Sequence, residues 1–398
     1  MTSNDQLYNL TIHTSGPLGD FCHLIIFNGF NEIVKKDYGK ISMDLPRGMY
    51  RLRLELNEES REEMIRLDQD VKLEQDPPLS HSSMPAHAFS SSYDYYTDEA
   101  VKWSLEPTTN KDKKGLWSAI FVFLRYPNAD LAKELNPQGK SPGKGFSILD
   151  ENRKVIYAFD STNTKENPDS GWLAFHAPVK NGQYYIHYSG KQKREIPLYA
   201  FNGWQSQLFI TIRDQPLFPS LKIATERVVT GFRPDNPVNY IMDASMQKMH
   251  NGIYFIPERI MTRLSEGNWE NPMIALLTAY IYFNSGKRDK DEQFRSLLKN
   301  YDRIVLDDHD APDLVALRML AYKYFNEPLN GFTLSAPSMF LTGMKIVSEL
   351  SAQHIKVYPE NSFMETIMKK LYADMEWTSY DPPPVGMIHH PKPLKQDA

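Results

Sequence analysis

The spacing of apolar and polar residues changes near residue 225 of this chain. Before that point, short apolar runs alternate with turn residues, and in 50–56 apolar and polar residues alternate strictly, as in a strand with one buried face. After it, apolar residues recur at helical spacing as far as about residue 377. The pattern predicts an α+β multidomain protein in which N-terminal antiparallel β-sandwich modules precede an all-α helical domain.

Turn signals and shifts in composition divide the chain into five predicted segments. They are a small β-sandwich module at 1–75, a linker with room for a short helix at 76–114, a second β-sandwich at 115–225, an α-helical domain at 226–380 and a disordered proline-rich tail at 381–398.

Strands are predicted where apolar runs are bounded by Gly, Pro, Asn or Asp. In the first module these runs lie at 7–13, 22–27 and 50–56, with a last strand pair within 64–74; in the second they lie at 115–124, 146–149, 155–159, 171–175, 184–188, 196–201 and 207–212. Gly48 and Gly182 each come just before an aromatic residue at the start of a strand. We expect a positive φ at both glycines, because residues with a Cβ adopt it at a cost.

Helix starts and stops are predicted from proline, glycine and acidic residues. The predicted helices lie at 97–104, 258–264, 273–283, 291–301, 314–325, 337–353 and 360–372. Pro312 and its acidic neighbours suit the first turn of the helix at 314–325, where the helix dipole favours negative charge.

Charge and composition narrow the classes of partner. The 398 residues carry a formal net charge of −5, so no positive field is available to attract nucleic acid or an anionic membrane. The longest apolar stretch, 273–283, is shorter than the roughly 20 residues that span a bilayer. The first residues lack the basic and apolar regions of a secretory signal, so we expect a cytoplasmic protein. The single cysteine, Cys22, lies in an apolar run and is expected to be a small buried hydrophobe.

No residue pattern indicates a catalytic, cofactor or metal site. The segment Gly139-Lys-Ser-Pro-Gly-Lys-Gly145 has neither the spacing nor the Ser/Thr of a phosphate-binding loop. The acids at 307–313 surround Pro312 and lack the distal Glu of a calcium loop, so we expect them to cap the following helix. We therefore expect a non-enzymatic protein without cofactor or metal.

Six segments within residues 75–380 occur in an order that is found in one known family. They are Ser91-Ser-Tyr-Asp-Tyr-Tyr96, Phe121-Val-Phe-Leu-Arg125, Ile196-Pro-Leu-Tyr-Ala-Phe-Asn-Gly-Trp-Gln-Ser-Gln-Leu-Phe209, Trp269-Glu-Asn-Pro-Met-Ile-Ala-Leu-Leu277, Asp310-Ala-Pro-Asp-Leu-Val-Ala-Leu317 and Ala336-Pro-Ser-Met339. With these segments the chain resembles a bacterial family of β-sandwich plus helical proteins found beside or fused to caspase-like (C14-type) proteases. The Gly203-Trp-Gln205 and Asn271-Pro-Met273 segments are the most specific. The resemblance transfers no catalytic residue.

The resemblance implies a scaffold, regulator or substrate that partners a caspase-like protease in a bacterial antiviral defence or signalling cassette. The linker is the expected docking or cleavage region, since proteases act on extended segments outside sheets. Its candidate residues are Lys111, Lys113 and Lys114 for a protease that prefers Lys or Arg, and Asp98 and Asp112 for one that prefers Asp.

Three alternatives stay open. The linker could be an ordered crossover, with Tyr93, Tyr95 and Tyr96 buried against the second module. The protein could be an enzyme whose site is assembled from acids and tyrosines of the helical domain. It could also be a structural adaptor unrelated to proteolysis.

Overall fold

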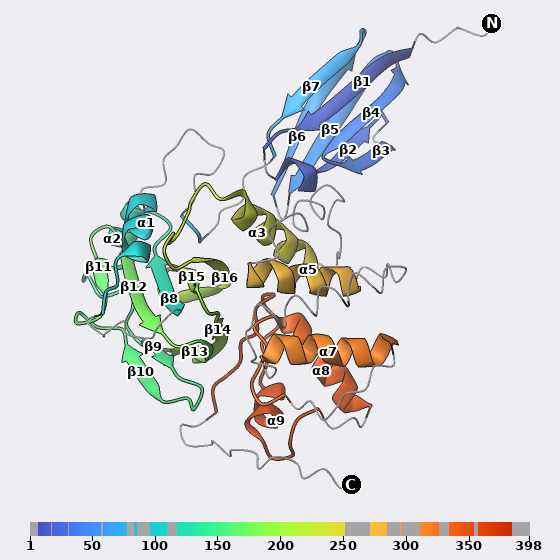
Figure 1. Ribbon diagram of the computed structural model, residues 1–398. Helices are drawn as coiled ribbons and strands as arrows, with labels where there is room; N and C mark the ends of the chain where they lie inside the picture. The colour runs from blue at the N-terminus through green and yellow to red at the C-terminus, as the bar shows by residue number, and fades with distance from the viewer. Residues whose placement is uncertain are drawn as a thin grey trace, which may run out of the picture. The chain divides into compact units, whose positions relative to one another are not determined.

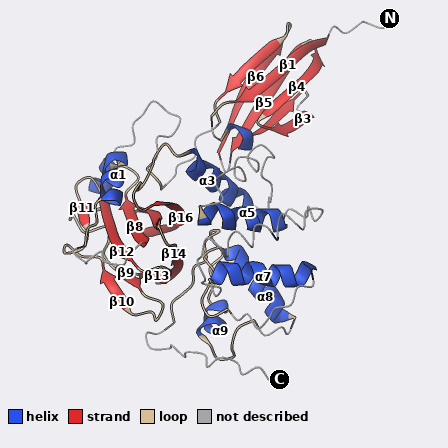
Figure 2. Cartoon of the chain, viewed as in Figure 1, coloured by secondary structure: helices blue, strands red, loops and turns tan. Residues whose placement is uncertain are grey.

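The computed structural model of the chain describes residues 7–16, 18–30, 32–56, 59–77, 83–85, 96–109, 118–250, 271–284, 295, 311–325, 334–353 and 357–383. These residues form a mixed α+β protein with several sheets and a helical C-terminal portion (Figures 1 and 2). The chain divides into two compact units: of the described residues, 7–77 and 235–250 belong to the first unit and the remainder to the second.

The first unit contains two sheets, with strand orders β4-β1-β7 and β3-β2-β5-β6. Its elements are β1 (Leu7–Thr14), the 3-10 helix η1 (Gly19–Phe21), β2 (His23–Phe27), β3 (Ile33–Tyr38), β4 (Lys40–Pro46), β5 (Gly48–Leu56), β6 (Glu59–Leu67), β7 (Val71–Gln75) and α3 (Pro237–His250). Neighbouring strands pair antiparallel, except β1 and β7, which are parallel.

Residues from both sheets of the first unit form one hydrophobic core. Leu10 and Ile12 of β1 join Leu24 of β2 and Leu52 and Leu54 of β5, all fully buried. Because side chains alternate along a strand, burying Leu52 and Leu54 directs the charged residues of β5 to the opposite side of the sheet.

Most strands of the first unit are those that the sequence predicts. β1, β2 and β5 and the pair β6 and β7 match the predicted runs, whereas β3 and β4 were not predicted. In β3 most side chains are exposed, so the strand has little apolar alternation to mark it.

The second unit contains two further sheets, with strand orders β11-β12-β8-β15-β16 and β10-β9-β13-β14. Their strands are β8 (Ser118–Arg125), β9 (Phe146–Leu149), β10 (Val155–Ala158), β11 (Lys165–Asn167), β12 (Trp172–Val179), β13 (Gly182–Tyr188), β14 (Arg194–Ala200), β15 (Trp204–Ile212) and β16 (Pro216–Arg227). β8 and β15 are parallel, and the other neighbours are antiparallel.

The position of a strand in the sheet explains whether its sequence pattern predicts it. Every residue of β8 and β12 is buried, as expected for central strands covered on both faces, and β8 reads as one continuous apolar run. β16 was not predicted, because Pro216 and Pro219 argue against a strand. β16 lies at a sheet edge, where a residue without an N–H is tolerated.

The second unit also contains α1 (Thr97–Leu105), α2 (Ala129–Leu135), α5 (Pro272–Asn284), α7 (Pro312–Phe325), α8 (Leu341–Ala352) and α9 (Phe363–Met368). α1, α5, α7, α8 and α9 fall within or close to predicted helices. The predicted helices at 258–264 and 291–301 lie outside the described residues, apart from residue 295. α8 begins at Leu341 and not at 337, because Phe340 before it is extended. The mixed α+β class is confirmed; the sandwich arrangement and the segment boundaries stay predictions.

The two glycine predictions have different outcomes. Gly182 has a φ of +134°, as predicted. The prediction for Gly48 is wrong: this glycine is the first residue of β5 and its φ is not positive. A Cβ at residue 48 would meet the Tyr50 ring at 3.5 Å, an ordinary contact.

Candidate interaction surface

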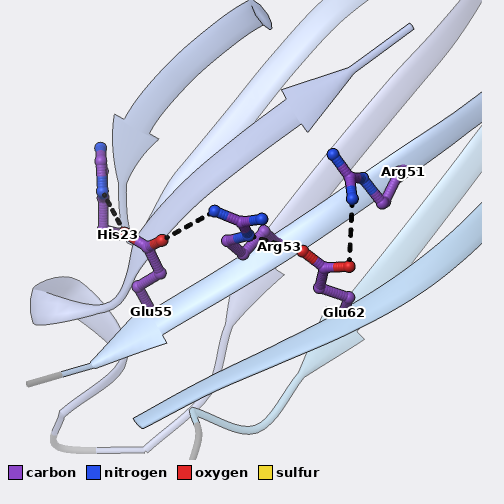
Figure 3. Close-up of polar contacts among 5 residues, drawn as sticks. All are labelled: His23, Arg51, Arg53, Glu55 and Glu62. Atoms are coloured by element: carbon purple, nitrogen blue, oxygen red, sulfur yellow. Dashed lines mark hydrogen bonds and ion pairs between the residues drawn. The ribbon is translucent and has the colours of Figure 1, made fainter. Parts of the chain in front are cut away.

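A row of charged side chains crosses the sheet β3-β2-β5-β6 on the side away from the core (Figure 3). His23 Nδ1 of β2 lies 3.2 Å from Glu55 Oε2 of β5, and Arg53 Nη1 lies 3.5 Å from Glu55 Oε1. Arg53 Nε donates to Glu62 Oε1 of β6 at 2.6 Å, and Arg51 Nη1 donates to Glu62 Oε2 at 3.3 Å. These five residues, here called the ionic ladder, connect three adjacent strands.

The ladder fixes side-chain positions more than it stabilises the fold. The hydrogen bond from Arg53 is the main cause that lowers the pKa of Glu62, and the same bond raises the pKa of Arg53. Both side chains are more than a third exposed, so solvent screens their attraction. What the ladder provides is a set of charged groups held in one register across the sheet.

Apolar side chains lie beside the ladder on the same side of the sheet. The guanidinium carbons of Arg51 and Arg53 lie 4.4 and 5.2 Å from the centre of the Phe27 ring, so the arginines cover this ring. Met64 is paired with Arg51 across the strands and is 64% exposed. Ile33 is paired with Phe27 and is 58% exposed.

Exposed apolar side chains gather at the end of the sheet where Phe27, Ile33 and Met64 lie. Among the residues that the structure describes, the large exposed hydrophobic residues are Leu7, Phe30, Ile33, Met49, Met64, Leu105, Val155, Leu217 and Val229. Three of these nine, Ile33, Met49 and Met64, lie on strands of this sheet, and a fourth, Phe30, lies in the turn before β3. Such gathering indicates a binding surface more than chance exposure does. The ionic ladder together with Ile33, Met49 and Met64 is here called the outer face.

The candidate residues of the predicted linker lie elsewhere. Asp98 is exposed in the first turn of α1, in the second unit, whereas 111–114 lies outside the described residues. Tyr96, just before α1, is buried and its hydroxyl donates to the Ser170 carbonyl oxygen at 3.0 Å. Cleavage after Asp98 would require α1 to unwind, because a helical backbone does not fit an extended protease cleft. Exposed Asp98 is therefore better suited to docking.

For Tyr96, burial agrees with the alternative of an ordered crossover. The other two residues of that alternative, Tyr93 and Tyr95, lie outside the described residues.

One acid and one tyrosine of the helical portion meet. Tyr280 donates its hydroxyl hydrogen to Asp313 Oδ1 at 3.0 Å, and the N–H groups of Met339 and Phe340 donate to Asp313 at 2.8 and 3.3 Å. Burial raises the pKa of Asp313 to about 6, and these hydrogen bonds oppose that effect. Asp313 was predicted as a helix-capping acid; it lies in the first turn of α7 and also holds the segment before α8. Tyr280 and Asp313 are enclosed, so this pair is a structural cross-link and not an open catalytic site.

A second buried network ties sheet strands to the end of the described chain. Arg153 Nε and Nη2 donate to the two oxygens of Glu195 at 3.1 and 2.7 Å, and His187 Nδ1 lies 3.0 Å from Glu195 Oε1. Arg153 also donates to the carbonyl oxygen of Pro383, so the first residues of the predicted tail pack here. Burial alone would raise the pKa of Glu195, but the bonds from His187 and Arg153 outweigh burial and lower it.

The single cysteine has the predicted role. Cys22 is fully buried, and burial raises its pKa to about 12, which disfavours the nucleophilic thiolate.

Lys248 of α3 also lies in this unit, where its Nζ donates to the Phe21 carbonyl oxygen at 3.0 Å. Burial lowers the pKa of Lys248 to about 8.

The described part of the chain contains neither a cluster of metal ligands nor a membrane-spanning helix. Within 7–383, leaving aside its undescribed gaps, no group of three or more His, Cys, Asp or Glu side chains is placed to hold a metal ion. No helix among the described residues is long and apolar enough to cross a membrane.

A scan against protein-family models and a search of curated proteins both find no match.

The outer face was not predicted as a site. The alternation in 50–56 indicates that Arg51, Arg53 and Glu55 share a wet face, but only the strand register brings Glu62 and Met64 beside them.

Proposed function

We propose that this protein is a non-enzymatic, cytoplasmic binding protein that serves a bacterial caspase-like protease as scaffold, regulator or substrate in a defence or signalling cassette. The observation that carries the binding role is the outer face, where exposed methionine and isoleucine side chains lie beside a preset ladder of charges. The protease as partner is supported by the resemblance of residues 75–380. We further propose that the sheets of each unit pack as the β-sandwich modules that the sequence predicts.

The outer face has the composition of a protein-binding surface. Methionine and arginine are enriched at the centres of protein interfaces, and covering exposed apolar side chains provides the driving force for association. Arg51 and Arg53 are already held by Glu62, so binding costs less side-chain entropy than ordering free arginines would.

Charge indicates what the partner surface carries. Arg66 is exposed and is paired with Met49 across the strands. Its Nε lies 2.9 Å from Asp68 Oδ2. Arg51, Arg53 and Arg66 are thus matched by three carboxylates, those of Glu55, Glu62 and Asp68, so this surface carries charges of both signs in fixed positions. We propose a protease surface with an apolar centre and a rim that carries charges of both signs.

The two other functional classes differ from this proposal in what they need. An enzyme built from acids and tyrosines would need an accessible pair, whereas Tyr280 and Asp313 are enclosed. An adaptor unrelated to proteolysis would use the same face for a different protein. The protease-binding test therefore separates the adaptor from the protease partner.

The test measures binding between the full chain and the purified caspase-like protease of the same host, with its catalytic cysteine replaced by serine, by biolayer interferometry. Met64→Glu places a charge on the outer face and should weaken binding at least about tenfold, a loss of about 1.4 kcal/mol. Val229→Glu is the matched control, because Val229 is 88% exposed but lies in the second unit. Absence of wild-type binding, or equal binding of both variants, would contradict the proposal.

The active protease then distinguishes the three roles. Cleavage of the bound chain within 111–114, read by intact mass, identifies a substrate. Stable binding without cleavage, with unchanged protease turnover, identifies a scaffold. Binding that changes turnover on a reporter peptide identifies a regulator.

A further inference from the structure

The strand β6 forms an open edge of the sheet β3-β2-β5-β6. It has nine residues and pairs with β5 on one side, and among the described residues no strand follows it on the other side. In an antiparallel pair every second residue directs its N–H and C=O groups away from the neighbouring strand, so β6 presents backbone groups along its free side. Such an edge is a template for pairing with a strand of another chain.

The side chains of β6 divide between the two faces of the sheet. Ile65 and Leu67 are buried in the core of the first unit. By alternation, Glu62, Met64 and Arg66 lie on the outer face, and all three are exposed. A strand added at the edge would place its own side chains directly beside these three.

The outer-face residues of β6 are complementary to those of a second copy. A two-fold axis pairs residues at equal distances on its two sides. With the axis at Met64 of antiparallel strands, the two methionines lie opposite each other, and Glu62 of each copy lies opposite Arg66 of the other. Opposite charges directly across two strands stabilise their pairing, and the symmetry supplies this contact twice.

Charge selects among the positions that the axis could take along β6. An axis at Glu62, at Glu63 or at Arg66 sets that residue opposite its own copy, and like charges directly opposite destabilise a strand pair. An axis at Ile65 sets Glu62 opposite Asp68 of the partner copy, which is again a pair of like charges. The axis at the methionine joins opposite charges and brings no like charges opposite each other.

The charged residues on the other face of β6 also fit this register. Arg61 and Glu63 form an ion pair with each other, and both are hydrogen-bonded to the side chain of Gln75 in β7. In this register Arg61 lies opposite Leu67 of the partner copy. Glu63 lies opposite Ile65 of the partner copy, so neither charged side chain meets a like charge.

We propose that two copies of this chain associate through antiparallel β6 strands about a two-fold axis at Met64. The sheets of the two copies then form one sheet, in which the two outer faces lie side by side. The pairing uses the edge of β6 and needs no protease, so it does not rest on the proposed function.

Analytical ultracentrifugation of the full chain without protease measures this association. The wild type should pass from monomer to dimer with a Kd of about 10–100 µM, because one pair of strands is a small interface. Arg66→Glu and Glu62→Arg should each raise the Kd at least about tenfold, since each sets like charges opposite each other. An equal mixture of the two variants should associate as the wild type does, because one carries two acids and the other two arginines at these positions.

Lys35→Glu is the matched control for Arg66→Glu. It makes the same change of charge at an exposed residue of β3, which forms the opposite edge of the same sheet. It should leave the Kd unchanged. A rise of the Kd in Lys35→Glu equal to that in Arg66→Glu would contradict pairing through β6.

Cysteine cross-linking tests the position of the axis. Met64→Cys should form a disulfide between two copies under mild oxidation, because opposite Cα atoms of an antiparallel pair lie about 4.5–5.5 Å apart. Ser60→Cys should not, since its two copies would be about 27 Å apart along the strands, at about 3.4 Å per residue. The native Cys22 is fully buried and does not compete.

Three results would overturn the proposal. They are a wild type that stays monomeric up to about 300 µM, charge variants that stay monomeric when mixed, and equal cross-linking of Met64→Cys and Ser60→Cys. Each is read without the protease, so none of them bears on protease binding by the outer face.

Discussion

Replacing Arg153 with glutamine should destabilise the second unit strongly. Arg153 neutralises Glu195 through two hydrogen bonds, and the Glu195 side chain has no solvent exposure. The substitution leaves a buried carboxylate that no arginine neutralises, although His187 still contacts it. Removing one partner of a buried ion pair is costly because the other charge stays desolvated.

The expected loss is about 3 kcal/mol, the lower end of the range of about 3–5 kcal/mol for breaking buried pairs. We take the lower end because His187 keeps its contact with Glu195. The substitution relieves no backbone strain, since Arg153 has a φ of +57° and glutamine is no easier to place there. Substituting Glu195→Gln as well should recover part of the loss, because the double variant has no unpaired charge.

Stability should also depend on pH in a defined direction. Glu195 has a lowered pKa in the folded wild type, so its contribution is present above the unfolded value near 4.5 and is lost as pH falls through the lower folded value. Without Arg153, burial instead favours the protonated form. The destabilisation by Arg153→Gln should therefore shrink as the pH is lowered towards 5.

Urea denaturation followed by tryptophan fluorescence measures this effect. Trp103, Trp172, Trp204 and Trp377 lie in the second unit, and the described residues of the first unit contain no tryptophan. Lys369→Gln, which breaks an exposed pair in the same unit, should unfold like the wild type. A loss below about 1 kcal/mol for Arg153→Gln, or a double variant as unstable as the sum of the single ones, would refute the reasoning.

Three further predictions concern stability and accessibility. Because burial raises the pKa of Asp313 to about 6, the folded state favours the protonated carboxyl, and the free energy of unfolding should fall by up to about 3 kcal/mol as the pH rises from 4 to 6. Asp313→Asn should remove this dependence in urea denaturation; an unchanged pH profile would count against it. Gly182→Val should cost about 1–2 kcal/mol, whereas Gly48→Ala should leave the melting temperature nearly unchanged, since only Gly182 has a positive φ. Trypsin should cut within 111–114 before it cuts after Lys102, whose backbone is helical in α1; first cuts after Lys102, read by intact mass, would contradict this.

Local patterns predict much of the secondary structure. The strict alternation of β5 and the continuous apolar run of β8 each reflect how many faces of the strand are buried. β16 contains Pro216 and Pro219, which argue against a strand in the sequence. A strand accepts proline at the edge of a sheet, and only the assembled sheet shows that β16 is an edge strand. The conformation of Gly48 could not be predicted from the sequence either, since a glycine before an aromatic residue can lie in a strand or in a turn.

The candidate sites depend on contacts between residues far apart in sequence. Arg153 and Glu195 are 42 residues apart, and Arg194 and Asp374 are 180 apart. No spacing rule links such pairs, because the sheet topology brings them together. The outer face likewise depends on the register of β5 with β6, which the alternation in one strand does not determine.

Methionine-methyl NMR tests the central claim most directly. The full chain, labelled with carbon-13 at its methionine methyl groups, is titrated with the inactive caspase-like protease. Met49 and Met64 are exposed on the outer face, whereas Met344 and Met364 are buried in the second unit. The account predicts that the Met49 and Met64 signals shift with saturation while those of Met344 and Met364 do not. A complex that forms and leaves Met49 and Met64 unchanged would contradict it.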